Sequence, residues 1–206
     1  MLKTGLENNG MQDSKLREIT LGQMLDEAIA SHPDNDAVVY VDRDFRLTYR
    51  EFGHLVDELA KGLMALGIQK GEKVAIWATN VPHWVALQFA TAKIGAILLT
   101  VNTYYKESEL AYLLQQSEAE NLVIIDGFKD TDYVQTVYSL VPELRTQQRG
   151  HLASKEFPHL QRVFFLGQEK HRGMYSLPEV IGLGRMISDP EYLARQESLH
   201  PHDVVN

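Results

Sequence analysis

The sequence predicts an α/β fold in which helices flank a layered, mostly parallel sheet, with a small hairpin near the N-terminus. Amphipathic helical stretches alternate with short apolar runs along most of the chain, which is the rhythm of strand–helix–strand units. The apolar runs at 74–78 and 97–101 do not alternate with polar residues, as expected for parallel strands buried on both faces. The hairpin is predicted from two β-rich segments, 37–41 and 45–48, joined at the turn Asp42-Arg43-Asp44.

The first two helices are predicted from their spacing and end signals. A short amphipathic helix is expected over 20–30. The next begins at a capping box of Thr48 and Glu51, in which the hydroxyl and the carboxylate each accept a backbone N–H. Apolar residues then recur at helical spacing until Gly67, which suits a left-handed C-terminal cap.

The elements after the strand at 74–78 continue the alternation. Pro82 suits the first turn of a helix that continues to Gly95, and Asn80 is expected to cap it. Asn102 is expected to stabilise the turn after the strand at 97–101. The remaining predictions are helices at 106–116, 133–140, 175–186 and 190–197, strands at 121–125 and 162–166, and a polar, irregular surface excursion at 143–160.

The length is enough for one large domain or for one domain with a partial second, and the composition is that of a globular protein. We assign residues 19–206 to the domain and residues 1–18 to a flexible leader rich in asparagine, glycine and charge. The formal net charge of −8 argues against a nucleic-acid-binding surface. The chain has no cysteine, which excludes disulfides and thiolate metal sites. No apolar run reaches the roughly 18 residues of a membrane span. The N-terminus is too polar for a secretory signal, so a cytoplasmic protein is expected.

The search for catalytic motifs is negative. Neither G-x-x-x-x-G-K-[ST] nor G-x-S-x-G occurs. Gly182-Leu183-Gly184 is interpreted as a glycine-tolerant surface helix, and His200-Pro201-His202-Asp203 as a solvated loop rather than a metal site. Asp126, Asp130 and Asp132 could pair for acid–base work, but ending a strand and capping a helix is the favoured interpretation. We therefore predict no catalytic residue, no metal ligand and no cofactor-binding residue.

Ligands of parallel α/β sheets bind beyond the carboxyl ends of the strands. The candidate loops are 78–82, 102–105 and 126–130. Trp84, Tyr104 and Tyr105 fall on this rim and are the candidate substrate-binding residues. Their alternative role, packing against the core or a neighbouring domain, is the more common one for aromatic side chains.

Several motifs together carry a resemblance to a known family. They are LTYREF at 47–52, GLMALGIQKGEKVAI at 62–76, NVPHWVALQFATAKIGAILLTVN at 80–102 and SEL at 108–110. These resemble the opening of the AMP-forming acyl-CoA synthetases of the adenylate-forming superfamily. IDGFKDTDYVQ at 125–135 and EKHRGMY at 169–175 are similar to the bacterial medium-chain fatty acid–CoA ligases in particular. The resemblance covers about residues 20–206.

The resemblance implies a two-step ligation with ATP, Mg²⁺ and coenzyme A. A fatty acid carboxylate attacks the α-phosphate of ATP, and the thiol of coenzyme A then displaces AMP. The family's phosphate loop follows a segment like the DVVN at 203–206, so the resemblance implies an N-terminal α/β subdomain truncated before that loop. We therefore expect this piece alone to be inactive, with an apolar face near 190–206 that favours self-association.

Two alternatives belong to other functional classes. One is a self-sufficient α/β domain that holds a small apolar or aromatic ligand between Trp84 and the Tyr104-Tyr105 rim. The other is an interaction module without enzymatic activity, since one layered α/β architecture serves many functions. No acyl chain length follows from these residues.

Overall fold

The computed structural model describes residues 17–206, so the leader predicted for 1–18 falls almost entirely outside the described residues. The helices are α1 (Leu21–Ser31), α2 (Tyr49–Ala65), α3 (Pro82–Ile94), α4 (Glu107–Ser117), α5 (Tyr133–Leu140), α6 (Leu177–Leu183) and α7 (Asp189–Glu197), with 3-10 turns η1 (Val41–Arg43), η2 (Pro142–Arg145) and η3 (Gly184–Met186). The strands are β1 (Asp36–Tyr40), β2 (Phe45–Thr48), β3 (Lys73–Trp77), β4 (Ile97–Thr100), β5 (Asn121–Ile124), β6 (Gly127–Phe128), β7 (Thr131–Asp132), β8 (Arg162–Phe165) and β9 (Tyr175–Ser176).

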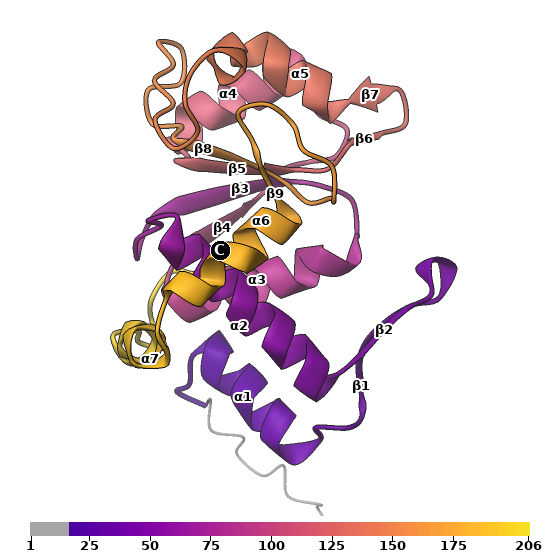
Figure 1. Cartoon of the computed structure of the whole chain (residues 1–206), viewed down its shortest axis with the longest axis vertical. Coiled ribbons are helices and arrows are strands. Elements are labelled where there is room, and N and C mark those ends of the chain that lie inside the picture. Colours follow the sequence, from indigo (N-terminus) through magenta and orange to yellow (C-terminus); the bar gives the residue numbers. More distant parts are fainter. Residues whose placement is uncertain (1–16) are drawn as a thin grey trace, which may run out of the picture.

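The main sheet of the described residues has five strands in the order β4-β3-β5-β8-β9, and each neighbouring pair is parallel. Strand β3 lies between β4 and β5, and Ala75 is opposite both Leu99 and Leu122. Figure 1 shows α4 and α5 over one face of the sheet and α2, α3 and α6 over the other. Parallel sheets need both faces covered, and this layering confirms the predicted α/β fold.

Two antiparallel hairpins stand outside the main sheet. The predicted one is β1–β2, in which Val39 is opposite Arg46. The second is β6–β7, a short pair in which Phe128 is opposite Thr131. The sequence predicts a loop at 126–130, because strands of two residues carry too little pattern to be recognised.

The predicted helix starts are mostly correct. Thr48 and Glu51 form the expected capping box, in which the Thr48 backbone N–H donates to Glu51 Oε2 at 2.8 Å. Asn80 does not cap α3, because the N-cap is Val81 and no side chain bonds there. Pro82 at the first helical position has no N–H to satisfy and its φ already suits a helix, so the cap is less needed.

The region predicted as one helix at 175–186 is divided. Tyr175 and Ser176 form the edge strand β9, α6 begins at Leu177, and the chain tightens to η3 at Gly184. Sequence periodicity could not reveal β9, because a strand of two residues is too short to show an alternating pattern.

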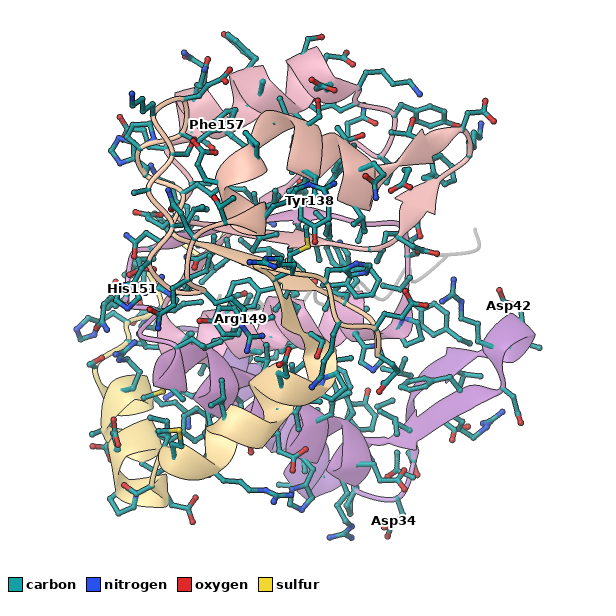
Figure 2. All side chains as sticks on the ribbon, turned by 45° about the horizontal axis from the view of Figure 1, so that its top comes forward. Asp34, Asp42, Tyr138, Arg149, His151 and Phe157 are labelled. Carbon is teal, nitrogen blue, oxygen red and sulfur yellow. The ribbon has the colours of Figure 1, made fainter. Side chains whose placement is uncertain are left out.

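The surface excursion at 143–160 is irregular, as expected, but apolar side chains anchor it. Leu144, Phe157 and Leu160 are at most 2% exposed. Arg149, labelled in Figure 2, fixes the excursion to the edge of the sheet by donating to the carbonyl of Met174 at 3.1 Å and to Glu179 at 2.9 Å. The excursion is therefore packed against the rest of the domain.

Helix α2 is crossed closely by α6 and by η3, in both places at a glycine. A Cβ atom at Gly62 would overlap the carbonyl oxygen of Val180, and one at Gly184 would lie 2.7 Å from the carbonyl oxygen of Glu58. Gly184 is buried, so the interpretation of Gly182-Leu183-Gly184 as a surface helix is wrong at this residue. Gly182 does face open space.

Gly62→Ala should destabilise the fold by about 1–3 kcal/mol, because the added methyl group forces two backbones apart. Gly182→Ala is the matched control and should be neutral or stabilising by up to about 1 kcal/mol, since alanine favours helix. Urea unfolding of both variants measures the difference. Equal stability of the two variants would show that the crossing tolerates a side chain.

A buried lysine joins helices on one side of the sheet. The Lys93 side chain is 2% exposed, and its Nζ lies 2.6 Å from Asp26 Oδ1 and 2.8 Å from Asp57 Oδ1. The hydroxyl of the buried Tyr192 also donates to Asp57, at 2.8 Å. These four residues connect α1, α2, α3 and α7. A buried charge needs such partners, because without them its desolvation is not compensated.

The contacts of Lys93 predict which substitutions in this cluster lower the free energy of unfolding most. The double variant Asp26→Asn and Asp57→Asn leaves the buried ammonium without a counter-charge and should lose about 3–5 kcal/mol of unfolding free energy. Lys93→Met should lose less, because it removes the buried charge and leaves two half-exposed carboxylates. Chemical denaturation gives both values, and a larger loss in Lys93→Met would contradict this account.

The C-terminal segment packs on the chain's own body. Arg195 donates to the carbonyls of Ile68 and Ile94, and the Leu98 N–H of the edge strand β4 donates to Val205 O at 3.0 Å. Leu193 and Val204 are the large apolar residues exposed here. Self-association through this face stays a prediction. Over residues 17–206, no helix is long and apolar enough to cross a membrane.

Candidate functional site

A cleft of about 670 Å³ opens at the carboxyl edge of the main sheet. Figure 1 shows the two hairpins, β1–β2 and β6–β7, projecting on this side of the molecule. The cleft is lined by the segments that follow β3, β5 and β8, by both hairpins and by the start of α6: Arg43, Phe45, Thr79, Val81, Pro82, His83, Ile125, Asp126, Gly127, Phe128, Lys129, Leu166, Gly167, Gln168 and Leu177.

Parallel pairing explains this position. Strands β3, β5 and β8 point the same way, so the loops after them meet at one edge, where ligands of such sheets bind. Two of the predicted loops, 78–82 and 126–130, contribute to the cleft. The third, 102–105, is not among the lining residues and contacts the cleft residue Lys129 through Tyr104.

The charges in the cleft favour an anion at its mouth. Arg43 comes from one hairpin and Lys129 from the other, and Asp126 is the carboxylate among the lining residues. The N-terminus of α3, which begins at Pro82, also lies at the cleft and adds partial positive charge. Lys129 adopts a left-handed backbone with φ of 52°, so its place in the turn is set by the hairpin.

His83 is the histidine among the residues that line the cleft. Burial lowers the pKa of its imidazole, because the charged form loses hydration. The ring stands edge-on to Phe45 of the β1–β2 hairpin, with centroids 5.7 Å apart. A neutral imidazole at this place can donate and accept hydrogen bonds without adding charge.

The predicted aromatic residues lie around the cleft rather than in it. Trp84 and Tyr105 are half-buried and pack against the core. Tyr104 is 61% exposed, stands edge-on to Phe128 at 5.4 Å, and accepts a hydrogen bond from Lys129 Nζ at 2.8 Å. None of the three is among the lining residues, so their contact with a ligand stays a prediction.

Sequence analysis missed an aromatic stack behind the cleft. The rings of Trp77 and Tyr133 are parallel within 10° and their centroids are 3.5 Å apart, and both side chains are fully buried. Burial raises the pKa of the Tyr133 hydroxyl to about 12. Trp77 sits in an apolar strand and Tyr133 at a helix start, and no local pattern links two positions so far apart.

The acidic and histidine motifs take structural roles. Asp132 caps α5 by accepting from the Gln135 N–H at 2.9 Å, as predicted. Asp203 accepts from the His200 N–H at 2.8 Å and pairs with Lys70 at 2.6 Å, which holds the loop at 200–203 in place. Among residues 17–206, no three His, Asp or Glu side chains are grouped so that they could hold a metal ion.

Comparison with known proteins gives the family. Residues 25–205 match the model described as "AMP-binding enzyme". The chain belongs to this family. The chain is similar to YngI of Bacillus subtilis (strain 168), which is named as an acyl-CoA synthetase: the two are 45% identical over 193 residues, covering 94% of this chain and 35% of YngI. The human medium-chain acyl-CoA ligase ACSF2, mitochondrial, is 32% identical, covering 96% of this chain and 32% of its own length.

Solved structures give the same fold. The crystal structure of a long-chain-fatty-acid–CoA ligase, FadD1 from Archaeoglobus fulgidus, has a TM-score of 0.64 and 25% identity, covering 82% of this chain and 30% of that one. The chain thus spans about a third of the length of the curated relatives it matches. The family resemblance seen in the motifs is confirmed, and so is the expected architecture.

The lowered pKa of His83 should appear in the stability of the chain. As pH falls below about 6.5, the unfolded chain binds a proton at this residue before the folded protein does. The free energy of unfolding therefore decreases as pH is lowered. His83→Gln should weaken that dependence. Urea unfolding between pH 8 and pH 5 measures it, and an identical pH profile in both proteins would contradict the assignment.

Proposed function

We propose that this chain forms part of an acyl-CoA synthetase that joins a fatty acid to coenzyme A in two steps driven by ATP. The observation that carries the proposal is the match of residues 25–205 to the AMP-binding enzyme family. Because the chain spans about a third of its relatives, the remaining parts of the activity are assigned to sequence beyond the match.

The proposed reaction has two displacement steps. A carboxylate oxygen of the fatty acid attacks the α-phosphorus of ATP, and pyrophosphate leaves with Mg²⁺ balancing its charge. The thiolate sulfur of coenzyme A then attacks the acyl carbon, and the bond to AMP breaks. Neither step uses a nucleophile from the protein, so binding and orientation of the three substrates are what the protein must supply.

The cleft suits one part of this task. ATP, coenzyme A and the fatty acid carboxylate are all anionic, and Arg43 and Lys129 place positive charge on the two hairpins at its mouth. Phe45, Phe128 and Leu166 add apolar side chains to the same walls, which could contact an uncharged part of a substrate. We assign Tyr104 to the rim of the cleft because it contacts Lys129. Trp84 and Tyr105 remain candidate substrate-binding residues beside it.

The cellular setting is also part of the proposal. We place the enzyme in the cytoplasm, which agrees with a chain that has no cysteine to oxidise. ATP with Mg²⁺, coenzyme A and a fatty acid are its proposed partners.

The test compares this 206-residue chain with a longer protein. The longer protein carries the same residues and is as long as the relatives that the chain matches. Each is mixed with ATP, Mg²⁺, coenzyme A and fatty acids of graded length, and AMP and pyrophosphate release are followed. We expect release from the longer protein and none from the chain alone. Release by neither, with tight binding of one small ligand to the chain, would favour a stand-alone binding domain and overturn the proposal.

Lys129→Met in the longer protein should raise the KM of one anionic substrate about twofold to fivefold, the loss expected for one exposed charge contact. Lys155→Met is the matched control, because Lys155 is exposed and lies outside the cleft. Initial-rate kinetics with each substrate varied in turn identify which one the cleft binds. An unchanged KM for all three substrates would remove Lys129 from substrate binding.

A further inference from the structure

We propose that Tyr133 is a positioning residue whose hydroxyl sets the place of the Lys129 ammonium at the cleft mouth. Tyr133 lies behind the cleft and is not among its lining residues. The inference rests on the proposed function only for the identity of the substrate. The coupling itself is argued from contacts within the chain.

Tyr133 binds two loops at once. Its backbone N–H donates to Asp126 O at 3.0 Å, at the base of the β6–β7 hairpin. Its hydroxyl donates to Thr103 O at 2.6 Å, in the loop that follows β4. One residue at the start of α5 therefore fixes the distance between the hairpin and that loop.

Trp77 supports the same loop from the strand. Its ring is stacked on Tyr133, and its indole N–H donates to Asn102 O at 3.2 Å. The loop is further closed by Asn102, whose side chain accepts from the Tyr104 N–H and whose carbonyl accepts from the Tyr105 N–H, both at 3.0 Å. The backbone of Tyr104 is thus held in one conformation by bonds that start in the buried stack.

The contacts that start at Tyr133 end at Lys129, a residue that lines the cleft. The Tyr104 hydroxyl accepts from Lys129 Nζ at 2.8 Å, and that ammonium lies 4.6 Å from the centre of the Tyr104 ring. A second link joins the same two segments, because Lys106 Nζ donates to Thr131 Oγ1. Lys129 has several free rotations, so a fixed acceptor is what keeps its charge at the mouth of the cleft.

The hydroxyl of Tyr133 does more than fill space. A phenylalanine would keep the stack on Trp77 but would leave the Thr103 carbonyl without this donor. Thr103 is partly buried, so losing this donor costs its carbonyl a hydrogen bond, and we expect the loop to rearrange towards another partner. Because burial raises the pKa of the hydroxyl to about 12, it remains a donor at every physiological pH.

The first test uses Tyr133→Phe in the 206-residue chain without any ligand. The amides of Tyr104 and Tyr105 should exchange about tenfold faster, the effect expected for the loss of one hydrogen bond. The ε-CH₂ signal of Lys129, shifted by the Tyr104 ring, should move towards the value of a free lysine. Both changes are followed by NMR.

Tyr138→Phe is the matched control. Tyr138 lies on the same helix, is also buried, and donates its hydroxyl to a backbone carbonyl, that of Arg172, at 2.9 Å (Figure 2). Its loss should leave the amides of Tyr104 and Tyr105 and the Lys129 signal unchanged. Equal effects of the two variants, or faster exchange spread evenly over the main sheet, would reduce Tyr133 to a stability role and overturn the proposal.

The second test uses the longer protein. Tyr133→Phe should raise the KM of the same substrate that Lys129→Met affects, and should add nothing in a Lys129→Met background. A full additional effect there would show that Tyr133 does not act through Lys129. If the NMR changes occur but no substrate is affected, the coupling stands and the assignment of the cleft in the proposed function fails.

Discussion

Parallel pairing of the strands is the constraint on which the rest of this structure depends. With β4, β3, β5, β8 and β9 all pointing one way, each connection must return the chain to the starting end of the next strand. Helices make most of these returns and cover both faces of the sheet. The same pairing gathers the loops after β3, β5 and β8 at one edge. The cleft, the Trp77–Tyr133 stack and the Tyr104–Lys129 contact all lie at that edge or behind it, so the site is a product of the topology.

Local patterns were enough to predict most of the fold. Continuous apolar runs marked β3, β4 and β5, and the Thr48–Glu51 capping box marked the start of α2, because these signals are encoded within a few neighbouring residues. Features that depend on distant partners were not predictable. Gly184 looks like a surface glycine until α2 lies against it, and Lys93 looks solvated until Asp26 and Asp57 converge on it from two other helices.

The site divides in the same way. Its location followed from strand direction, which sequence order already contains. Its chemistry did not, since Arg43 and Lys129 come from hairpins whose positions in space depend on packing across the whole domain. The aromatic residues predicted from sequence lie near the correct edge of the sheet. Trp84 and Tyr105 pack against the core, and Tyr104 contacts Lys129. The stacking of Trp77 on Tyr133 could not be predicted, because no local sequence pattern links two residues so far apart.

The strand order also decides how the protein can be made. Strand β3 pairs with β4 and β5, so these three can assemble once residue 124 has emerged from the ribosome. The outer side of β5 must then wait for β8, which follows only after α5 and the excursion at 143–160. During that interval the apolar strand β5 presents an open edge to the cell, the kind of surface that invites wrong pairing.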